Sequence, residues 1–447
     1  MSTVQYPRPG QPPVEAPSGH EIPHVPSPYA GRLMSHWELV KISIFWFGSN
    51  LIWGAFLGPV LAQEMTVLAP RNSAQMLGLL YFVAAFPALL IPLIVGALSD
   101  RCTHPRGRRK PFILWGGLGG TVGLAVMLLA AKLGSLPVFF LGYLVVQTGM
   151  NTAIAAFSGI IPDLVPQEQK GAASGWMAVM SNVATLIGGV VSGVLVADNP
   201  QLVFLLLAVV FTFFLVLSVL GIRENRLEGD VPKMQWGPYL RSLWSVLADH
   251  PDFRWVWITR ALMMLGFYAV SPMILFFLRD QLKLENPAKD AGMVMGIILI
   301  GATISGLIGG AISDRTGRKP VVYFATALIS IMSLSFIFCH TLIQTLLAGV
   351  VFGIGYGAYI SVDWALGADV LPAKEDAAKD MGVWHIAMVL PQQISPLIGG
   401  AILGMYEIAG TKDPVRYQPG GFAGIFIFAA VFFALSGLLL RNVKGAR

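Results

Sequence analysis

The sequence predicts an all-α membrane protein in which twelve transmembrane helices form two pseudo-symmetric bundles of six. Three observations predict this fold class. Of the 447 residues, 55% are hydrophobic and only 12% are charged, about half the charged share of an average soluble domain. The apolar residues form separate runs, each near the roughly 20 residues that a helix needs to cross a bilayer. Two loop motifs also recur, in the same order, in the two halves of the chain.

The order of apolar and polar segments predicts the domains. The start of the chain is rich in proline and has no apolar core, which predicts a disordered cytoplasmic tail over residues 1–34. The longest connection, 223–252, contains an amphipathic stretch, Trp236 to Leu247, that we expect to lie along the membrane surface. It separates six-helix bundles at 35–222 and 253–447. The predicted spans lie near 38–62, 75–98, 111–132, 137–161, 171–196, 201–222, 253–278, 289–312, 320–340, 342–368, 379–404 and 421–441.

Lysine and arginine residues predict the orientation of these spans. If both termini are cytoplasmic, the inner connections hold 22 of these residues and the outer connections hold 7. Because basic residues concentrate on the cytoplasmic side of membrane proteins, we expect this orientation, in the inner membrane of a bacterium. The net charge of +6 is therefore a topology signal, and no nucleic-acid partner is expected.

The repeated motifs follow corresponding spans in the two halves. Gly96-Ala-Leu-Ser-Asp100-Arg101 and Gly107-Arg-Arg-Lys-Pro111 follow the second span, and Gly310-Ala-Ile-Ser-Asp-Arg-Thr-Gly-Arg-Lys-Pro320 follows the eighth. Pro162-Asp-Leu-Val-Pro166 follows the fourth span, and Ala368-Asp-Val-Leu-Pro372 follows the tenth. These repeats indicate a duplicated six-span unit. Duplication with a cleft between the halves is typical of carriers that expose one site to each side of a membrane in turn.

The same motifs carry a resemblance to a known family. The loop Gly-x-x-Ser-Asp-Arg…Gly-Arg-Arg/Lys-x-Pro resembles the loop signature of the major facilitator superfamily, and it is present in both halves. Residues 99–113 are similar to the corresponding loop of plant-type sucrose/proton symporters and related bacterial sugar carriers. Further similarity lies at Asn151, Asp163-Leu164, Trp176, Asn182 and 382–392. The resemblance implies a secondary active transporter, namely a proton-coupled symporter of a sucrose-like disaccharide or related glycoside.

Charged residues in the repeated loops are candidates for gating. We expect Asp100 to cap the N-terminus of a facing helix, and Arg101 and Arg108 to pair with Asp163. In the second half, the corresponding residues are Asp314, Arg315, Arg318 and Asp369. These bonds would form a latch that is made in the outward-open state and broken in the inward-open state. The alternative is that the arginines only fix the topology.

Polar and aromatic residues within the spans are candidates for binding substrate. Because polar groups are costly in hydrocarbon, they are expected to face the interior of the bundle. Amides, hydroxyls and rings suit a neutral polyhydroxylated ligand. The alternative is that some of them join helices to one another. The candidates are Asn50, Trp53, Gln147, Asn151, Asn182, Phe267, Tyr356, Tyr359, His385 and Gln392.

A pair of charged residues within the second-half spans, Arg260 and Asp363, is the candidate for proton coupling. If they form a buried ion pair, protonation of the carboxylate would break it and could drive a conformational change. A permanent structural pair is equally compatible with the sequence. His385 is a second candidate for a proton site, or a neutral hydrogen-bonding residue.

Gln147 stands where the plant symporters have an aspartate, and they have a proline at the position of Asp363. Coupling has therefore moved to the second half, or the carrier is uncoupled or differently coupled.

Other functions are compatible with the same fold. A drug or metabolite exporter is the main alternative, favoured by Met263, Met264 and Met388, because methionine-rich cavities suit apolar ligands. A sensor that does not transport is a further alternative. The sequence has no HExxH or GxSxG motif and no zinc-ligand cluster, so we expect neither an enzyme nor a cofactor. The expected partners of a monomeric carrier are a small-molecule substrate, a proton and the lipid bilayer.

Overall fold

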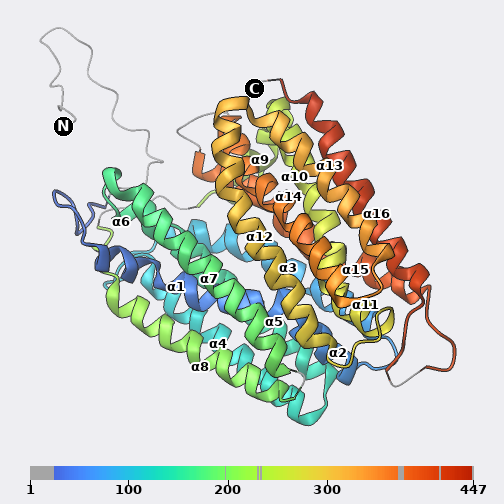
Figure 1. Cartoon of the computed structure of the whole chain (residues 1–447). Coiled ribbons are helices and arrows are strands. Elements are labelled where there is room, and N and C mark those ends of the chain that lie inside the picture. Colours follow the sequence, from blue (N-terminus) through green and yellow to red (C-terminus); the bar gives the residue numbers. More distant parts are fainter. Residues whose placement is uncertain are drawn as a thin grey trace, which may run out of the picture.

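The computed structural model describes residues 25–196, 198–228, 231, 234–370, 377–411 and 414–444. These residues are almost entirely helical, with one isolated β-bridge between Glu407 and Tyr417. Within these described ranges, twelve helical segments are long and apolar enough to cross a membrane, which confirms the predicted fold class (Figure 1). The long helices are α1 (His36–Leu57), α3 (Ser73–Asp100), α4 (Lys110–Leu133), α5 (Leu136–Ser158), α7 (Lys170–Val196), α8 (Pro200–Gly221), α10 (Pro251–Val270), α12 (Pro287–Thr316), α13 (Arg318–Ser335), α14 (Leu342–Asp369), α15 (Ala377–Gly404) and α16 (Pro419–Leu439).

Short helices extend two of these spans, and another short helix follows the end of the first span. The run predicted at 38–62 is divided, because α1 ends at Leu57 and α2 (Pro59–Leu68) begins after Gly58. Proline is favoured at the first position of a helix because its fixed φ suits the helix and its missing N–H is not needed there. The short helix α6 (Ile160–Leu164) follows α5, and α11 (Ile274–Asp280) follows α10 after the 3-10 turn η2 (Ser271–Met273).

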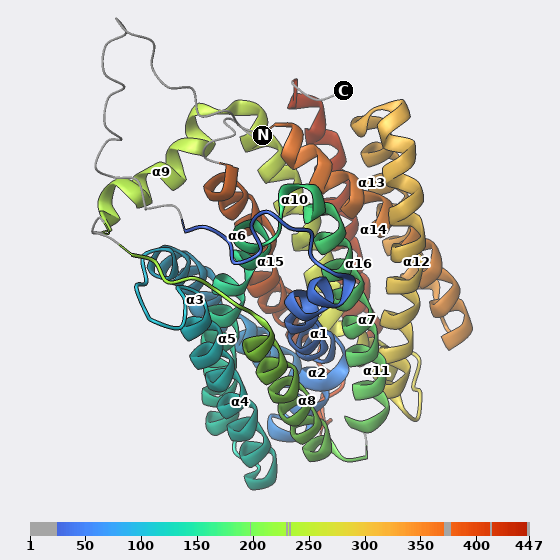
Figure 2. The same cartoon turned by 90° about the vertical axis from the view of Figure 1, so that its left-hand side faces the viewer.

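The helices pack as two groups. In the first group, α1 to α8, the contacts include α1 with α7 and α4 with α5; in the second, α10 to α16, they include α12 with α14 and α10 with α15. Two pairs of long helices cross between the groups, α3 with α15 and α7 with α12. The short helix α2 also contacts α11, α12 and η2. Figures 1 and 2 show the first group in blue to green and the second in yellow to red.

The two ends of the molecule differ. We call the end with the Asp100 and Asp314 loops the basic end, and the end with residues 69–72, 281–286, 405–411 and 414–418 the far end. The groups are hydrogen-bonded at the far end, where the Ala74 N–H donates to Tyr417 Oη (3.1 Å) and the Val415 N–H donates to the Pro70 carbonyl (2.7 Å).

Glycines bring the helices of the two groups close together at the far end. A Cβ on Gly78 of α3 would lie 2.6 Å from Leu397 Cα of α15, and one on Gly400 would overlap the Ala74 carbonyl oxygen. Gly292 of α12 approaches Gly189 and Gly193 of α7. Small residues allow membrane helices to approach closely. The far end is therefore closed in this structure.

The amphipathic stretch in the connection between the groups is a helix, α9 (Trp236–Asp249), at the basic end (Figure 2). Leu243 and Val246 are buried on its inner side, whereas Leu240 and Trp244 are exposed, Trp244 to 74%. An exposed apolar stripe next to polar residues is the pattern of a helix that lies at a membrane surface.

Of the predicted tail, 1–34, residues 1–24 lie outside the described residues. Residues 25–34 contact the first group of helices. Ser27 Oγ donates to the Leu164 carbonyl (2.7 Å), and the Met34 backbone exchanges two hydrogen bonds with the Gln169 side chain (2.7 and 2.9 Å). Tyr29 and Met34 are buried, and burial of apolar side chains favours these contacts.

Candidate functional site

The charged residues predicted within the second-half spans meet. Arg260 of α10 and Asp363 of α14 form an ion pair, and each residue is only 1% exposed. Asp363 also accepts a hydrogen bond from Tyr359 Oη (3.2 Å), one helical turn earlier on α14. The carboxylate therefore has a cation and a hydroxyl as partners, as a buried charge requires.

Aromatic rings surround the other side of this guanidinium. Arg260 Cζ lies 3.4 Å from the ring centroid of Trp384 and 5.8 Å from that of Trp364. Arg260 Nη2 also approaches Met388 Sδ at 3.6 Å. A ring face attracts a cation most strongly where water is excluded. The two tryptophans were missed as functional candidates, although Trp384 lies only one residue before His385.

His385, a candidate for both substrate and proton binding, has an accessible side chain on α15. It lies three residues before Met388 on α15, so the two side chains share a face of the helix. Further along α15, Gln392 is half-buried, whereas its neighbour Gln393 is buried, with no hydrogen-bond partner for Oε1 among the described residues. Gln393 was not a sequence candidate.

Two of the predicted substrate-binding rings stack on one another. The rings of Phe267 on α10 and Tyr356 on α14 have centroids 4.4 Å apart and an angle of 11° between their planes. Because this contact covers one face of each ring, each can offer a ligand only its other face. Phe352, one turn earlier on α14, is in turn stacked against Phe267 at 6.4 Å.

The amides of the first group are linked along α5. Gln147 is buried and donates to Tyr143 Oη (2.9 Å), and it accepts from Asn151 Nδ2 (3.0 Å). Asn151 is half-buried and also donates to the Gln147 carbonyl (2.8 Å). Gln147 thus positions Asn151, and Asn151 is the amide that a ligand can reach.

The other first-group candidates have separate surroundings. Asn50 of α1 donates to the Trp46 carbonyl (2.9 Å) and to Ser181 Oγ of α7 (3.3 Å), so it joins two helices. Trp53 is half-buried with its ring edge-on to Phe56, and Asn182 is exposed on α7.

At the basic end, the gating candidates gather around an arginine that the sequence did not single out. Arg109 contacts Asp100 (2.7 Å), Asp163 (2.6 Å) and Ser99 Oγ (3.2 Å). Arg108 contacts Asp163 (2.7 Å), as predicted, but the second arginine on Asp163 is Arg109 instead of Arg101. Arg101 donates to the Ala97 carbonyl. Gly159 makes room for Arg109, because a Cβ there would overlap its guanidinium.

The helix cap expected from Asp100 comes from another residue. Glu224, in the segment that leaves α8, accepts from the backbone N–H of Lys110 (2.9 Å) at the start of α4, while Asp100 pairs with Arg109. A carboxylate is favoured at this position because N-terminal N–H groups lack partners within the helix. Burial raises the pKa of Glu224, and its bonds to these N–H groups partly oppose that rise.

The second half repeats the cluster. Arg318 contacts Asp314, Ser313 Oγ (2.8 Å) and Asp369 (3.2 Å), so it is the counterpart of Arg109, whereas Arg315 is exposed. Each of these ion pairs lies within one group of helices. They are formed while the far end is closed, so the bonds of the expected latch do not require an open far end.

One buried carboxylate was missed altogether. Glu64 of α2 is 1% exposed, and its Oε1 has no hydrogen-bond partner among the described residues. Burial raises its pKa to about 7. The sequence pattern placed the end of the first span at residue 62, which left Glu64 in a connection. Among the described residues, no group of His, Cys, Asp and Glu side chains could hold a metal ion.

Comparisons with known proteins match most of the chain. A family model described as Major Facilitator Superfamily matches residues 42–378 and 286–445. The multi-drug resistance efflux pump PmrA of Streptococcus pneumoniae serotype 4 is 23% identical over 381 residues, 82% of this chain and 90% of that protein. The proton-associated sugar transporter A of Mus musculus is 33% identical over 103 residues, 22% of this chain and 13% of that protein.

Solved structures have the same fold. A bacterial homolog of the human lysosomal transporter Spinster, in its inward-facing and unoccupied conformation, has a TM-score of 0.70 at 14% identity; the match covers 91% of this chain and 98% of that one. The nucleoside transporter NupG has a TM-score of 0.67 at 14% identity, and the match covers 91% of this chain and 99% of that one.

Proposed function

Because the chain belongs to the major facilitator superfamily, and is therefore a transporter, we propose that it carries a disaccharide or related glycoside together with a proton. The observation that supports a sugar is the chemistry within the spans. Asn151 is half-buried and spends its N–H groups on Gln147, so its carbonyl oxygen is available to a ligand hydroxyl. Tyr356 offers a ring face, and rings suit the apolar faces of sugars.

The proposed movement is a rocking of two rigid bundles, 35–222 and 253–447, linked by 223–252. Hydrogen bonds and glycine contacts between the groups at the far end support this proposal, because such contacts can break when that end opens. We assign the basic end to the cytoplasm of a bacterium, with both termini on that side. Basic loops and exposed tryptophans at this end, Trp37, Trp115 and Trp244, support the assignment.

The proposed proton site of the sugar carrier is Asp363. Protonation would neutralise the carboxylate and release Arg260 and Tyr359. An unpaired charge in this buried place is unfavourable by several kcal/mol. The pair therefore opens only when a proton or a ligand replaces the lost interaction, and this dependence would couple proton binding to movement.

Transport into proteoliposomes tests the proposal. Vesicles containing the purified protein are given radiolabelled sucrose, maltose or another disaccharide, with the outside two pH units more acidic than the inside. We expect accumulation that a protonophore abolishes and that an equal sodium gradient does not support. If internal sugar exchanges for external sugar at a rate that does not depend on the proton gradient, the substrate is a sugar but its transport is not coupled to protons. No flux of any sugar would exclude both.

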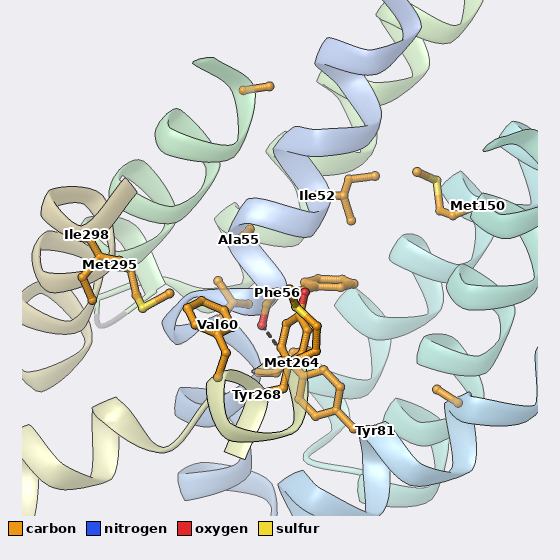
Figure 3. Close-up of a cluster of buried hydrophobic side chains, with 14 of the residues drawn as sticks. Ile52, Ala55, Phe56, Val60, Tyr81, Met150, Met264, Tyr268, Met295 and Ile298 are labelled. Carbon is orange, nitrogen blue, oxygen red and sulfur yellow. Dashed lines mark hydrogen bonds between the residues drawn. The ribbon is translucent and has the colours of Figure 1, made fainter. Parts of the chain in front are cut away.

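A second candidate function, export of apolar compounds, has its own support. Figure 3 shows Met264 and Met295 in a cluster with Phe56, Tyr81 and Tyr268, and PmrA is a multi-drug resistance efflux pump. Methionine and aromatic side chains adapt to apolar ligands of varied shape. In the same vesicles, proton-driven movement of ethidium, together with no sugar uptake, would favour export over the sugar carrier.

A further inference from the structure

We propose that Glu64 is a proton-binding site that gains a proton when the far end closes and loses it when the far end opens. The inference rests on the proposed alternating access, and it adds a second proton site to Asp363. Nothing in the repeated motifs or in the ion-pair clusters includes this residue.

The position of Glu64 links it to the far end. It lies on α2, which contacts α3 and α7 of the first group and α11, α12 and η2 of the second. Its neighbours along the helix, Val60, Leu61 and Met65, are fully buried. Figure 3 shows Val60 beside Tyr268 and Met295, which belong to the second group. Separation of the groups at the far end would therefore bring water to α2.

No neighbouring positive charge among the described residues offsets a negative charge on the Glu64 carboxyl group. The titratable side chains toward this end on surrounding elements include Tyr81 on α3, Tyr268 on α10, Arg279 and Asp280 on α11, and Lys289 and Asp290 on α12. Arg279 is engaged by Asp280 through two bonds of 2.7 Å. Burial is the cause of the raised pKa of Glu64, with no contribution from a neighbouring charge. Since an isolated buried carboxylate is unfavourable, Glu64 is mostly neutral in the closed state below about pH 7.

The sign of the pH effect follows from the two states. In the closed state the pKa of Glu64 is about 7, whereas in water its ordinary value is 4.5. Between these values the closed state binds more protons, so acidification favours closure. Above pH 7 the group is ionised in both states and closure is least favourable. Between pH 8 and pH 6, the ratio of closed to open molecules should rise about tenfold.

Spin labels across the far end measure this ratio. Arg71 and Asn286 are exposed and lie in the connections before α3 and α12, one in each group. Both are changed to cysteine and labelled in a Cys102→Ser, Cys339→Ala background, and pulsed EPR gives the distance distribution in lipid nanodiscs from pH 5 to 8.5. With Glu64 present, we expect the short distance to gain about tenfold over the long one between pH 8 and pH 6.

Three variants decide the outcome. Glu64→Gln and Glu64→Met replace the carboxyl group with a polar and an apolar side chain, neither of which titrates. Both variants should keep the short distance dominant at every pH. Glu285→Gln removes an exposed carboxylate of the same end and should leave the pH response unchanged. An unaltered pH response in both Glu64 variants would overturn this inference while leaving alternating access intact. A single distance at all pH values, with and without sugar, would overturn both.

Discussion

At the scale of single residues, the buried ion pair could be predicted from the sequence, whereas the central role of Arg109 could not. Arg260 and Asp363 are charged residues inside apolar runs, and the high cost of a lone charge there predicts that they meet. Arg108 and Arg109 are adjacent and chemically identical, so sequence alone does not show which one turns inward. Which arginine turns inward depends on the backbone at Gly107, whose φ of +106° favours glycine. It also depends on the space beside Gly159, which the Arg109 guanidinium occupies.

The buried pair predicts a non-additive effect of substitutions on stability. Asp363→Asn leaves the Arg260 charge without its counter-charge, so we expect a loss of about 3–5 kcal/mol in thermal or denaturant unfolding in detergent. The double variant Arg260→Met, Asp363→Leu should recover most of this loss. If the double variant still accumulates sugar against its gradient, the pair is structural and Asp363 is not the proton site.

The cluster at Arg109 predicts that two neighbouring arginines respond differently to the same change. Arg109→Lys replaces a buried guanidinium that has three partners with a single ammonium group, and we expect a loss of about 2–4 kcal/mol of stability. Arg108→Lys can keep one contact with Asp163 in a more exposed position and should lose less than about 1 kcal/mol. Thermal unfolding of the two variants, side by side, gives the comparison. Equal losses would contradict the assignment of Arg109 as the central residue.

At the scale of elements, span length and composition predicted twelve helices, because a bilayer requires about 20 apolar residues whatever the packing. The break at Gly58 was missed because the apolar run continues across it, so the length of the run carried no sign of two helices. The sequence also does not predict which glycines lie at contacts between helices. Gly382 and Gly400 lie on the same helix, yet only a Cβ at Gly400 would meet another helix.

The contact between α3 and α15 predicts opposite outcomes for two alanine substitutions. Gly400→Ala places a methyl group against the Ala74 carbonyl, and we expect a loss of about 1–3 kcal/mol from the closed far end. Gly382→Ala has nothing within 4 Å and should be neutral, or stabilise α15 by up to about 1 kcal/mol. The distance between labels at residues 71 and 286 reports the first effect, and thermal unfolding reports both. A neutral Gly400→Ala would show that the helices separate easily there.

At the scale of the whole molecule, the repeats predicted two related units, but they could not predict which end of the molecule is closed. A carrier that alternates must fit one sequence to two arrangements, so the composition of the loops favours neither. The closed end depends on contacts between distant segments. The Tyr417 hydroxyl, for example, reaches the start of α3 across 343 positions of sequence. For the same reason the sequence predicts which residues belong to the candidate site but does not predict how they are arranged in space.

The hydroxyl of Tyr417 predicts a measurable shift between these arrangements. Tyr417→Phe removes the acceptor of the buried Ala74 N–H, and an unsatisfied buried donor costs about 1–3 kcal/mol. We therefore expect the open far end to become about tenfold more populated in the pulsed EPR measurement. Tyr406→Phe, at an exposed tyrosine of the same end, should change nothing. Identical distance distributions for both variants would contradict a role for Tyr417 in closure.

The two copies of the arginine cluster also differ in their access to solvent. The side chains of Arg109 and Asp163 are 9% and 20% exposed, whereas those of Arg318 and Asp369 are 21% and 45% exposed. Mobile ions screen exposed charges much more effectively than buried ones. Raising the ionic strength should therefore weaken the ion pairs of the second copy and leave those of the first copy in place. Concentrated salt would then act selectively on the second half of the carrier.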